Sequence, residues 1–175
     1  MTWDHQEFAA VFNELYPNVC RFLECMLGRS GNAQEVAQES FVRLYRKGRP
    51  NMPSKEARFW VYRVARNLAL NELSRTQTRT RLVDKARGAL DAMPKHPDQQ
   101  YEESERNAVL IGLLESLPEH QRAVLILREQ QEMSYAEIAR VLNVSEGKIK
   151  IDIHRARMRL REKWNEIHEP RAAIK

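Results

Sequence analysis

The stretch SYAEIARVLNVSEGKIKIDIHRARMRLRE, residues 134–162, has the pattern of two helices joined by a tight turn. Ser134 followed by Glu137 is a capping box, which predicts the start of a short first helix. Asn143 can adopt the left-handed conformation that a sharp turn between helices requires. Ser145 then caps a longer second helix. Its apolar residues recur at spacings of three and four: Ile149, Ile153, Ala156 and Leu160. This order predicts a helix-turn-helix.

The second of these helices carries a basic face. If its apolar positions face a core, seven residues are left toward solvent: Lys148, Lys150, Ile151, Asp152, His154, Arg155 and Arg159. Lys and Arg neutralise phosphates, and Arg also reads guanine edges, so this face suits the major groove of DNA. The alternative is a helical hairpin with a purely structural role.

Positive charge is concentrated in two parts of the 175-residue chain, whose net charge is +5. Residues 41–100 carry 14 basic and 5 acidic side chains, and residues 148–163 carry 7 basic and 2 acidic ones. Two separate positive segments indicate two contacts with a polyanion. Solvated helix faces are the alternative at this stage.

Helical periodicity also runs through the first 76 residues. Asp4 is expected to cap a first helix, and Pro17 in its middle should kink or split it. Asn32 is expected to cap a second helix, and Ser54 a third that runs from residue 55 to about residue 76. The third helix is apolar on most sides and needs partners around it. The first two helices can supply them in a compact helical unit.

Residues 77–104 lose this periodicity. They contain two prolines, alternating charges and few large apolar side chains, which is typical of a flexible linker. A structureless stretch of this length is unusual inside one compact domain. We therefore predict an all-α chain of two small helical domains, residues 1–76 and 105–175. A flexible linker joins them, and the C-terminal domain is a helix-turn-helix.

The third predicted helix interleaves aromatic and basic side chains in the stretch FWVYRVARNLALNEL. Aromatic rings stack on unpaired bases, arginines follow the sugar-phosphate backbone, and a side-chain amide can bond a base edge. The candidate residues for a single-stranded nucleic acid are Arg58, Phe59, Trp60, Arg63, Arg66 and Asn67. The alternative is core packing, the commoner role of an aromatic residue such as Trp60 on an apolar helix.

Several other classes of protein do not fit the sequence. No apolar run approaches the ~20 residues of a membrane-spanning helix, and the N-terminus lacks the pattern of a signal peptide, so we expect a cytoplasmic protein. Cys20 and Cys25 would lie about 140° apart around a helix, so we expect no disulfide between them and no metal site. We find no nucleophile with a base and no phosphate-binding glycine loop. We therefore expect neither an enzyme nor a cofactor.

Three blocks of the sequence resemble a known family. NAQEVAQESFVRLYRKG, FWVYRVARNLALNELSR and LPEHQRAVLILREQQEMSYAEIARVLNVSEGKIKIDIHRARMRLRE are similar to the second and fourth regions of bacterial RNA polymerase sigma factors of the extracytoplasmic-function group. They occur in the family's order, with a short linker in place of the third region. The resemblance covers roughly residues 8–76 and 105–163. It implies a protein that binds core RNA polymerase and directs promoter-specific transcription initiation.

The resemblance also implies a role for each block. Glu35, Gln38 and Glu39 would contact the polymerase, although a solvated acidic face is their alternative. The segment from Gly48 to Asn67 would melt and read the minus-ten promoter element, with one base flipped into a pocket and the arginines guiding the non-template strand. The basic helix would lie in the major groove of the minus-thirty-five element. An anti-sigma factor that wedges between the two domains would be a further partner.

One departure from the family pattern concerns the basic helix. Relatives commonly have Ser-Arg where this chain has Ile151 and Asp152. If Asp152 faces the groove, it can accept a hydrogen bond from cytosine, and Ile151 can contact a thymine methyl group. That arrangement predicts an unusual minus-thirty-five sequence. The alternative is that Asp152 pairs with Arg155 or Lys148 on its own helix and reads no base.

Two rival functions stay open from the sequence. A helix-turn-helix regulator that acts without polymerase would explain the C-terminal domain but not the aromatic and basic helix. A sigma-mimicking decoy that titrates an anti-sigma factor would be expected to lose DNA-reading side chains, and the change at Ile151 and Asp152 is compatible with that. Transcription with core polymerase separates these functions from a sigma factor.

Overall fold

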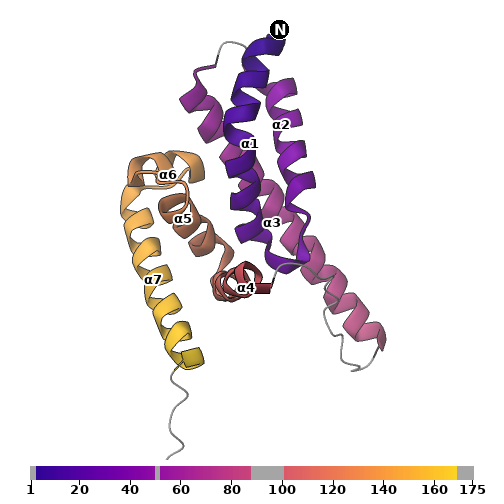
Figure 1. The fold of residues 1–175 in the computed structure, drawn as a ribbon, viewed down its shortest axis with the longest axis vertical. Coiled ribbons are helices and arrows are strands. Elements are labelled where there is room, and N and C mark those ends of the chain that lie inside the picture. The colour runs from indigo at the N-terminus through magenta and orange to yellow at the C-terminus, as the bar shows by residue number, and fades with distance from the viewer. Residues whose placement is uncertain (1–2, 50–51, 88–100, 169–175) are drawn as a thin grey trace, which may run out of the picture.

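The computed structural model describes residues 3–49, 52–87 and 101–168. These residues form seven α-helices and a 3-10 turn, Gly28–Ser30, and contain no strand (Figure 1). The all-α prediction is confirmed. The helices are α1 (His5–Leu27), α2 (Ala33–Lys47), α3 (Ser54–Arg87), α4 (Tyr101–Glu115), α5 (Glu119–Glu129), α6 (Tyr135–Leu142) and α7 (Glu146–His168).

Helices α1, α2 and α3 pack against one another as the first helical unit. The predicted caps are present, because Asp4 accepts hydrogen bonds from two backbone N–H groups of α1 and Asn32 accepts one from Glu35 at 3.2 Å. Of the two outcomes predicted for Pro17, a kink or a split, the split is wrong, because α1 runs through Pro17 as one helix. Proline removes a single N–H donor, and the buried Leu15 and Val19 on either side hold both halves of the helix in the core.

Helix α3 is longer than the sequence pattern predicts. It continues past Thr76 to Arg87, although the side chains from Ser74 to Leu82 are mostly exposed. The first glycine or proline after Ser54 is Gly88, so no residue interrupts the helix before that point. The loss of apolar periodicity therefore marks the end of packing and not the end of the helix. The remainder of the predicted linker up to residue 100 lies outside the described residues.

Helices α5, α6 and α7, with α4 beside them, form the second unit. The capping box of Ser134 and Glu137 is present, and Asn143 ends α6 in the left-handed conformation at φ 56° and ψ 51°. Ser145 then accepts a hydrogen bond from the backbone N–H of Lys148 at 3.3 Å. The short helix, the turn and the longer helix therefore follow in the predicted order.

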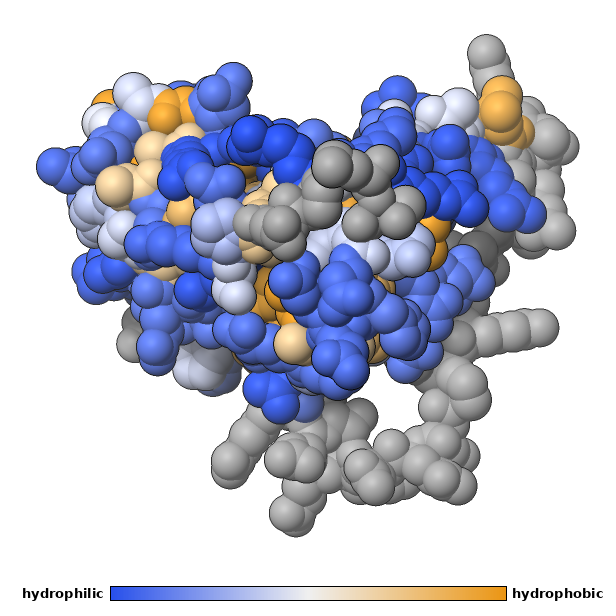
Figure 2. Space-filling view, turned by 90° about the horizontal axis from the view of Figure 1, so that it is seen from above, coloured by the Kyte–Doolittle hydropathy of each residue, from blue (hydrophilic) through white to orange (hydrophobic). Residues whose placement is uncertain are grey.

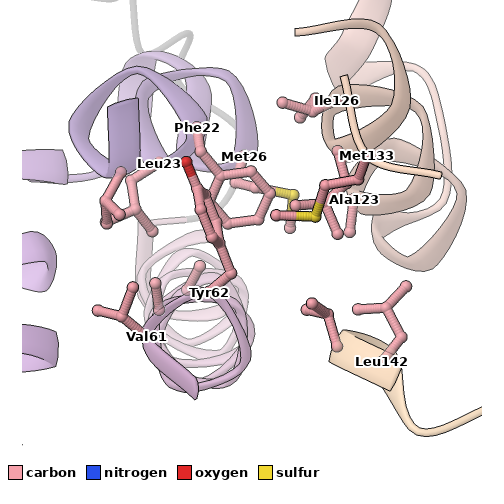
Figure 3. Packing of buried hydrophobic residues seen from close by; sticks show 14 of the residues in the cluster. Phe22, Leu23, Met26, Val61, Tyr62, Ala123, Ile126, Met133 and Leu142 are labelled. Carbon is pink, nitrogen blue, oxygen red and sulfur yellow. The ribbon is translucent and has the colours of Figure 1, made fainter. Parts of the chain in front are cut away.

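The two units share one hydrophobic core. Figure 3 shows Met26 of α1 and Met133, which precedes α6, pointing toward each other between the units. Both are fully buried, as are Leu27 and Ala123. The sequence predicted two domains joined by a flexible linker and gave no sign of this contact.

The face of the molecule seen in Figure 2 is mostly hydrophilic, with hydrophobic residues in scattered patches. Ile151 and Trp164, both on α7, are among the exposed large hydrophobic residues. Within the described ranges, no helix has both the length and the apolar character needed to cross a membrane.

Candidate nucleic-acid interface

The first turns of α7 present most of the predicted groove-facing side chains to solvent. Ile149, Ile153 and Ala156 are buried, as their spacing predicts. Six of the seven candidate residues are exposed: Lys148, Lys150, Ile151, His154, Arg155 and Arg159. Ile151 has 52% of its surface accessible, so an apolar side chain lies within the basic face.

Asp152 is the exception, because it is only 4% exposed. Its Oδ2 lies 2.9 Å from Nε2 of His120 and 2.9 Å from Nζ of Lys148. The expectation that Asp152 lies toward solvent and faces the groove is therefore wrong for this structure. The alternative pairing with Lys148 is present. His120 could not be identified from the sequence pattern because it lies 32 residues earlier, in the first turn of α5.

His120 connects three helices. Burial is the main influence on its pKa and lowers it; the Asp152 carboxylate raises it, and Lys148 and Arg66 lower it further. A neutral imidazole fits both neighbours, because Nε2–H can donate to Asp152 while Nδ1 accepts from Nη2 of Arg66 at 3.5 Å. The basic helix α7 is thereby linked through α5 to α3.

The other two candidate arginines of α3 also bind the second unit. Nη2 of Arg58 donates to the backbone carbonyl of Gln131 at 2.6 Å. Arg63 donates from Nε to the carbonyl of Val141 at 3.1 Å and from Nη2 to that of Arg140 at 2.6 Å. Their partners lie 73 to 78 residues away in the chain, so no local pattern could reveal them.

The remaining candidate residues of α3 differ in exposure. Asn67 is exposed and accepts a hydrogen bond from Arg66 at 3.1 Å. Trp60 is half-buried, and Phe59 is only 4% exposed. Cations lie over the Phe59 ring, with Lys55 Nζ 5.7 Å and the Arg140 guanidinium 5.1 Å from its centroid. Stacking of a base on Phe59 is therefore excluded in this arrangement, and the core-packing alternative applies to it.

A cavity of about 360 Å³ lies between the α2–α3 loop and α6. Trp60 and Phe59 form part of its wall, and Glu56 is its one acidic lining residue. Its basic lining residues are Lys47, Arg49, Arg63 and Arg140. The half-buried ring of Trp60 beside a basic rim suits a flat ligand that carries negative charge.

The candidate polymerase contacts lie on α2. Glu35, Gln38 and Glu39 are all exposed, and Glu39 pairs with Arg43 at 2.7 Å across one turn of the helix. The buried side of α2, with Ala37 and Phe41, packs toward the first unit. The acidic side is therefore free to meet a partner.

The interface between the units contains polar contacts that the sequence pattern did not predict. Arg122 is 6% exposed and donates to the carbonyls of Met26 at 2.6 Å, Glu115 at 3.0 Å and Leu117 at 3.2 Å. The hydroxyl of Tyr62 donates to the side chain of Gln131, and burial raises the pKa of that hydroxyl. Arg122 within the apolar stretch of α5 could have indicated these contacts, because a buried arginine needs hydrogen-bond partners from other parts of the chain.

Two partly exposed ion pairs also join the units. Lys55 Nζ lies 3.1 Å from Oε1 of Glu137, and Nη2 of Arg140 lies 3.5 Å from Oε1 of Glu56. The backbone of Ser134 and the Lys55 ammonium lower the pKa of Glu137, which keeps its carboxylate charged.

The two cysteines are free thiols. Cys20 and Cys25 are both half-buried, and burial raises the pKa of each. Among the side chains that the structure describes, no group of His, Cys, Asp and Glu could hold a metal ion.

Comparison with known proteins adds to this geometry. Two family models match the chain: Sigma-70 region 2 over residues 11–80, which fall within α1 to α3, and Sigma-70, region 4 over residues 108–160, which span α4 to α7. The matched segments are the two helical units that share the core.

Curated relatives cover both units. The ECF RNA polymerase sigma factor SigM of Bacillus subtilis is 31% identical over 154 residues, which are 87% of this chain and 92% of SigM. The ECF RNA polymerase sigma factor SigE of Mycolicibacterium smegmatis is 30% identical over 145 residues, which are 82% of this chain and 56% of SigE. The chain thus spans little more than half the length of SigE.

A solved structure shares the fold. The sigma factor RpoE, in complex with the anti-sigma factor NepR from Bartonella quintana, matches with a TM-score of 0.64 and 21% identity. The match covers 90% of this chain and 96% of that chain.

Proposed function

The chain belongs to the extracytoplasmic-function group of bacterial RNA polymerase sigma factors, and from that premise we propose that it binds core polymerase and directs initiation at specific promoters. The observation that carries the proposal is the pairing of an exposed basic face on α7 with an aromatic and basic helix, α3, in one chain. The basic face of α7 suits duplex DNA, and α3 suits an unpaired strand. A helix-turn-helix regulator that binds only duplex DNA needs the face of α7 but not the pattern of α3.

The face of α7 is our candidate for the minus-thirty-five element. Exposed cations over its first turns would neutralise phosphates and read base edges, and Ile151 would contact a thymine methyl group. We assign Asp152 a positioning role, because its carboxylate is held by His120 and Lys148 below that face. The groove contacts are then Lys148, Lys150, Ile151, His154, Arg155 and Arg159.

Helix α3 and the cavity beside it are our candidate for the minus-ten element. Trp60 and Asn67 would meet unpaired bases, and Arg58, Arg63 and Arg66 would follow the backbone of the separated strand. The exposed acidic side of α2, with Glu35, Gln38 and Glu39, would meet the polymerase. By function, residues 1–76 would form the docking and melting domain, residues 77–104 the linker and residues 105–175 the duplex-binding domain.

An anti-sigma factor is the proposed regulator. The similar sigma factor RpoE is in complex with the anti-sigma factor NepR, and this chain has the same two-unit fold. A partner that binds both units at once would cover their DNA-binding surfaces together. Binding to such a partner would take place in the cytoplasm, where polymerase acts.

Transcription in vitro tests the proposal. Purified core polymerase is incubated with this protein and a library of promoter sequences, and the transcripts are sequenced. We expect starts that require the protein and share two sequence elements upstream. Binding to core without specific starts would favour the decoy, and binding to duplex DNA without binding to core would favour the polymerase-independent regulator.

A further inference from the structure

The last turns of α3 extend beyond the packed part of the protein. The helix continues to Arg87, and the side chains from Ser74 to Leu82 are mostly exposed. Figure 1 shows this end of α3 projecting past the other helices. We name residues 74–82 the α3 arm. Because the arm buries little surface, packing does not account for the side chains that it carries.

The α3 arm has an unusual composition. Residues 74–81 have the sequence SRTQTRTR, in which every side chain is that of Ser, Arg, Thr or Gln. Each of these side chains carries an N–H or O–H group that can donate to a phosphate oxygen. The sequence has no acidic residue between Glu72 and Asp84, so the three arginines give the arm a charge of +3. The arm is therefore a continuous row of donors for an anion.

The arginines of the α3 arm are available to a partner. Arg75, Arg79 and Arg81 are all exposed. Among the side chains that the structure describes, none lies within ion-pair distance of these three guanidinium groups. Gln77 lies 3.5 Å from Glu119 of α5, so the arm begins beside the second helical unit and leads away from it. The positive charge of the arm is thus directed at solvent.

The residue types of the α3 arm do not favour the helix itself. Threonine is a weaker helix former than alanine, lysine or glutamate, because its branched side chain loses freedom against the preceding turn. Arg75 and Arg79 lie one turn apart, and like charges at that spacing repel each other. An anion that contacts both would remove the repulsion. The composition therefore indicates a polyanionic partner and not a helix end kept for its own stability.

The α3 arm also lies between the two candidate DNA-reading parts of the chain. Along the helix axis, Arg75 lies about 12 Å and Arg81 about 21 Å beyond Asn67, the candidate for an unpaired base. These distances correspond to about four to six base pairs of duplex DNA. The chain then continues to the C-terminal unit, where α7 is the candidate for the upstream element. Duplex DNA between the two elements is the polyanion that fits this position.

We propose that the α3 arm binds the sugar-phosphate backbone of duplex DNA between the two promoter elements, without reading its base sequence. The inference rests on the proposed function of the chain in promoter recognition. Arg75, Arg79 and Arg81 neutralise phosphates, and the hydroxyl and amide groups between them donate hydrogen bonds. The helical part of the predicted linker is then a third DNA contact, separate from the candidate residues of α3 and α7.

Promoter binding by the complex with core polymerase tests the inference. The arm variant combines Arg75→Gln, Arg79→Gln and Arg81→Gln. On a promoter identified by transcript sequencing, we expect it to bind about tenfold more weakly than wild type. A plot of log affinity against log salt concentration should become shallower by about two to three, since each lost phosphate contact removes about 0.9 from the slope. Affinity for core polymerase without DNA should stay unchanged.

A matched control variant removes the same charge elsewhere. It combines Arg21→Gln, Arg46→Gln and Arg161→Gln, three exposed positions on α1, α2 and α7 outside the proposed DNA contacts. We expect its promoter affinity to stay within about twofold of wild type. Equal promoter affinities of the arm and control variants would overturn the inference.

Neutral DNA tests the same contact from the other side. A promoter with uncharged methylphosphonate linkages between the two elements should weaken wild type and the control variant about tenfold. The arm variant should lose little more on this DNA, because its contact is already removed. An equal loss by all three proteins would contradict a contact between the arm and these phosphates. Weaker binding of the arm variant to core polymerase without DNA would also overturn the inference and assign the arm to the polymerase.

A lysine variant separates lost charge from damage to the helix. It combines Arg75→Lys, Arg79→Lys and Arg81→Lys, keeps the charge, and should bind the promoter within about twofold of wild type. Binding as weak as that of the arm variant would overturn a contact based on phosphate charge. Failure of the proposed function is distinguishable, because wild type with core polymerase would then form no specific promoter complex. Failure of this inference alone leaves the wild-type complex intact.

Discussion

His120 and Asp152 join α5 to α7 at a junction within the second helical unit, with 2.9 Å between Nε2 of the histidine and Oδ2 of the aspartate. The other ring nitrogen of His120 faces Arg66 on α3. A change at this junction therefore affects the anchoring of α7, the contact between the two units, or both. DNA sequence preference is a separate property, because the exposed face of α7 lies outside the junction.

Replacing Asp152 by alanine should lower stability without changing the preferred DNA sequence. The change leaves the partly buried Nε2–H of His120 without its acceptor, at a cost of about 1 kcal/mol in the free energy of unfolding. Urea denaturation measures that cost, and selection from random duplexes measures the preference. Lys150→Ala is the control, since it should weaken duplex binding with little effect on stability. A changed base preference in Asp152→Ala would contradict this prediction and would support a contact between Asp152 and a base.

Acidification should weaken the fold through His120. Burial lowers the pKa of this residue in the folded state, so the unfolded chain binds more protons between the folded pKa and the unfolded value of about 6.5. The stabilisation is present above about pH 6.5 and is lost as the pH falls below it. Urea denaturation of wild type and His120→Gln at pH 7.5 and pH 5.5 measures the effect. The loss on acidification should be larger in wild type, and an equal loss in both proteins would contradict this assignment.

Local signals in the sequence predicted the helices and caps well. Ser134, Glu137 and Asn143 specify a turn through hydrogen bonds and backbone angles that involve only their neighbours. The extent of α3 could not be predicted from apolar periodicity, since the side chains from Ser74 to Leu82 are mostly polar and exposed. Pro17 does not split α1, because the buried residues on both sides of it hold the helix in the core.

The candidate site was predictable in part. Exposed cations on α7 follow from helical spacing, because spacing alone decides which side faces the core. Asp152 is buried against His120, 32 residues away in the chain, and Arg63 donates to the carbonyl of Val141 at the end of α6, 78 residues away. Contacts of that kind require the packing of the two units, which the sequence pattern leaves undetermined.

Arg122 should be one of the costliest positions to change. Arg122→Ala would leave the carbonyls of Met26, Glu115 and Leu117 without this donor inside the interface. We expect a loss of about 3 kcal/mol in the free energy of unfolding, measured by urea denaturation. Arg161→Ala, at an exposed position, should stay within about 0.5 kcal/mol of wild type. A similar small effect at Arg122 would show that the interface contributes little to stability.

Charge reversal on α2 should separate polymerase binding from folding. Glu35→Arg is expected to weaken the affinity for core polymerase about tenfold while the unfolding midpoint stays unchanged, because Glu35 is exposed. Competition binding with labelled protein measures the affinity. Glu14→Arg, an exposed position on α1, is the matched control. Equal effects of the two variants would indicate a general charge effect and no specific contact.

In the proposed function, one chain reads two promoter elements through two helices, α7 and α3. Sequencing of transcripts from a promoter library tests this, with core polymerase and wild type, Ile151→Ala or Asn67→Ala. We predict that Ile151→Ala relaxes sequence preference only in the upstream element and that Asn67→Ala relaxes it only in the element near the transcription start. Specific starts whose two elements are insensitive to both substitutions would contradict it.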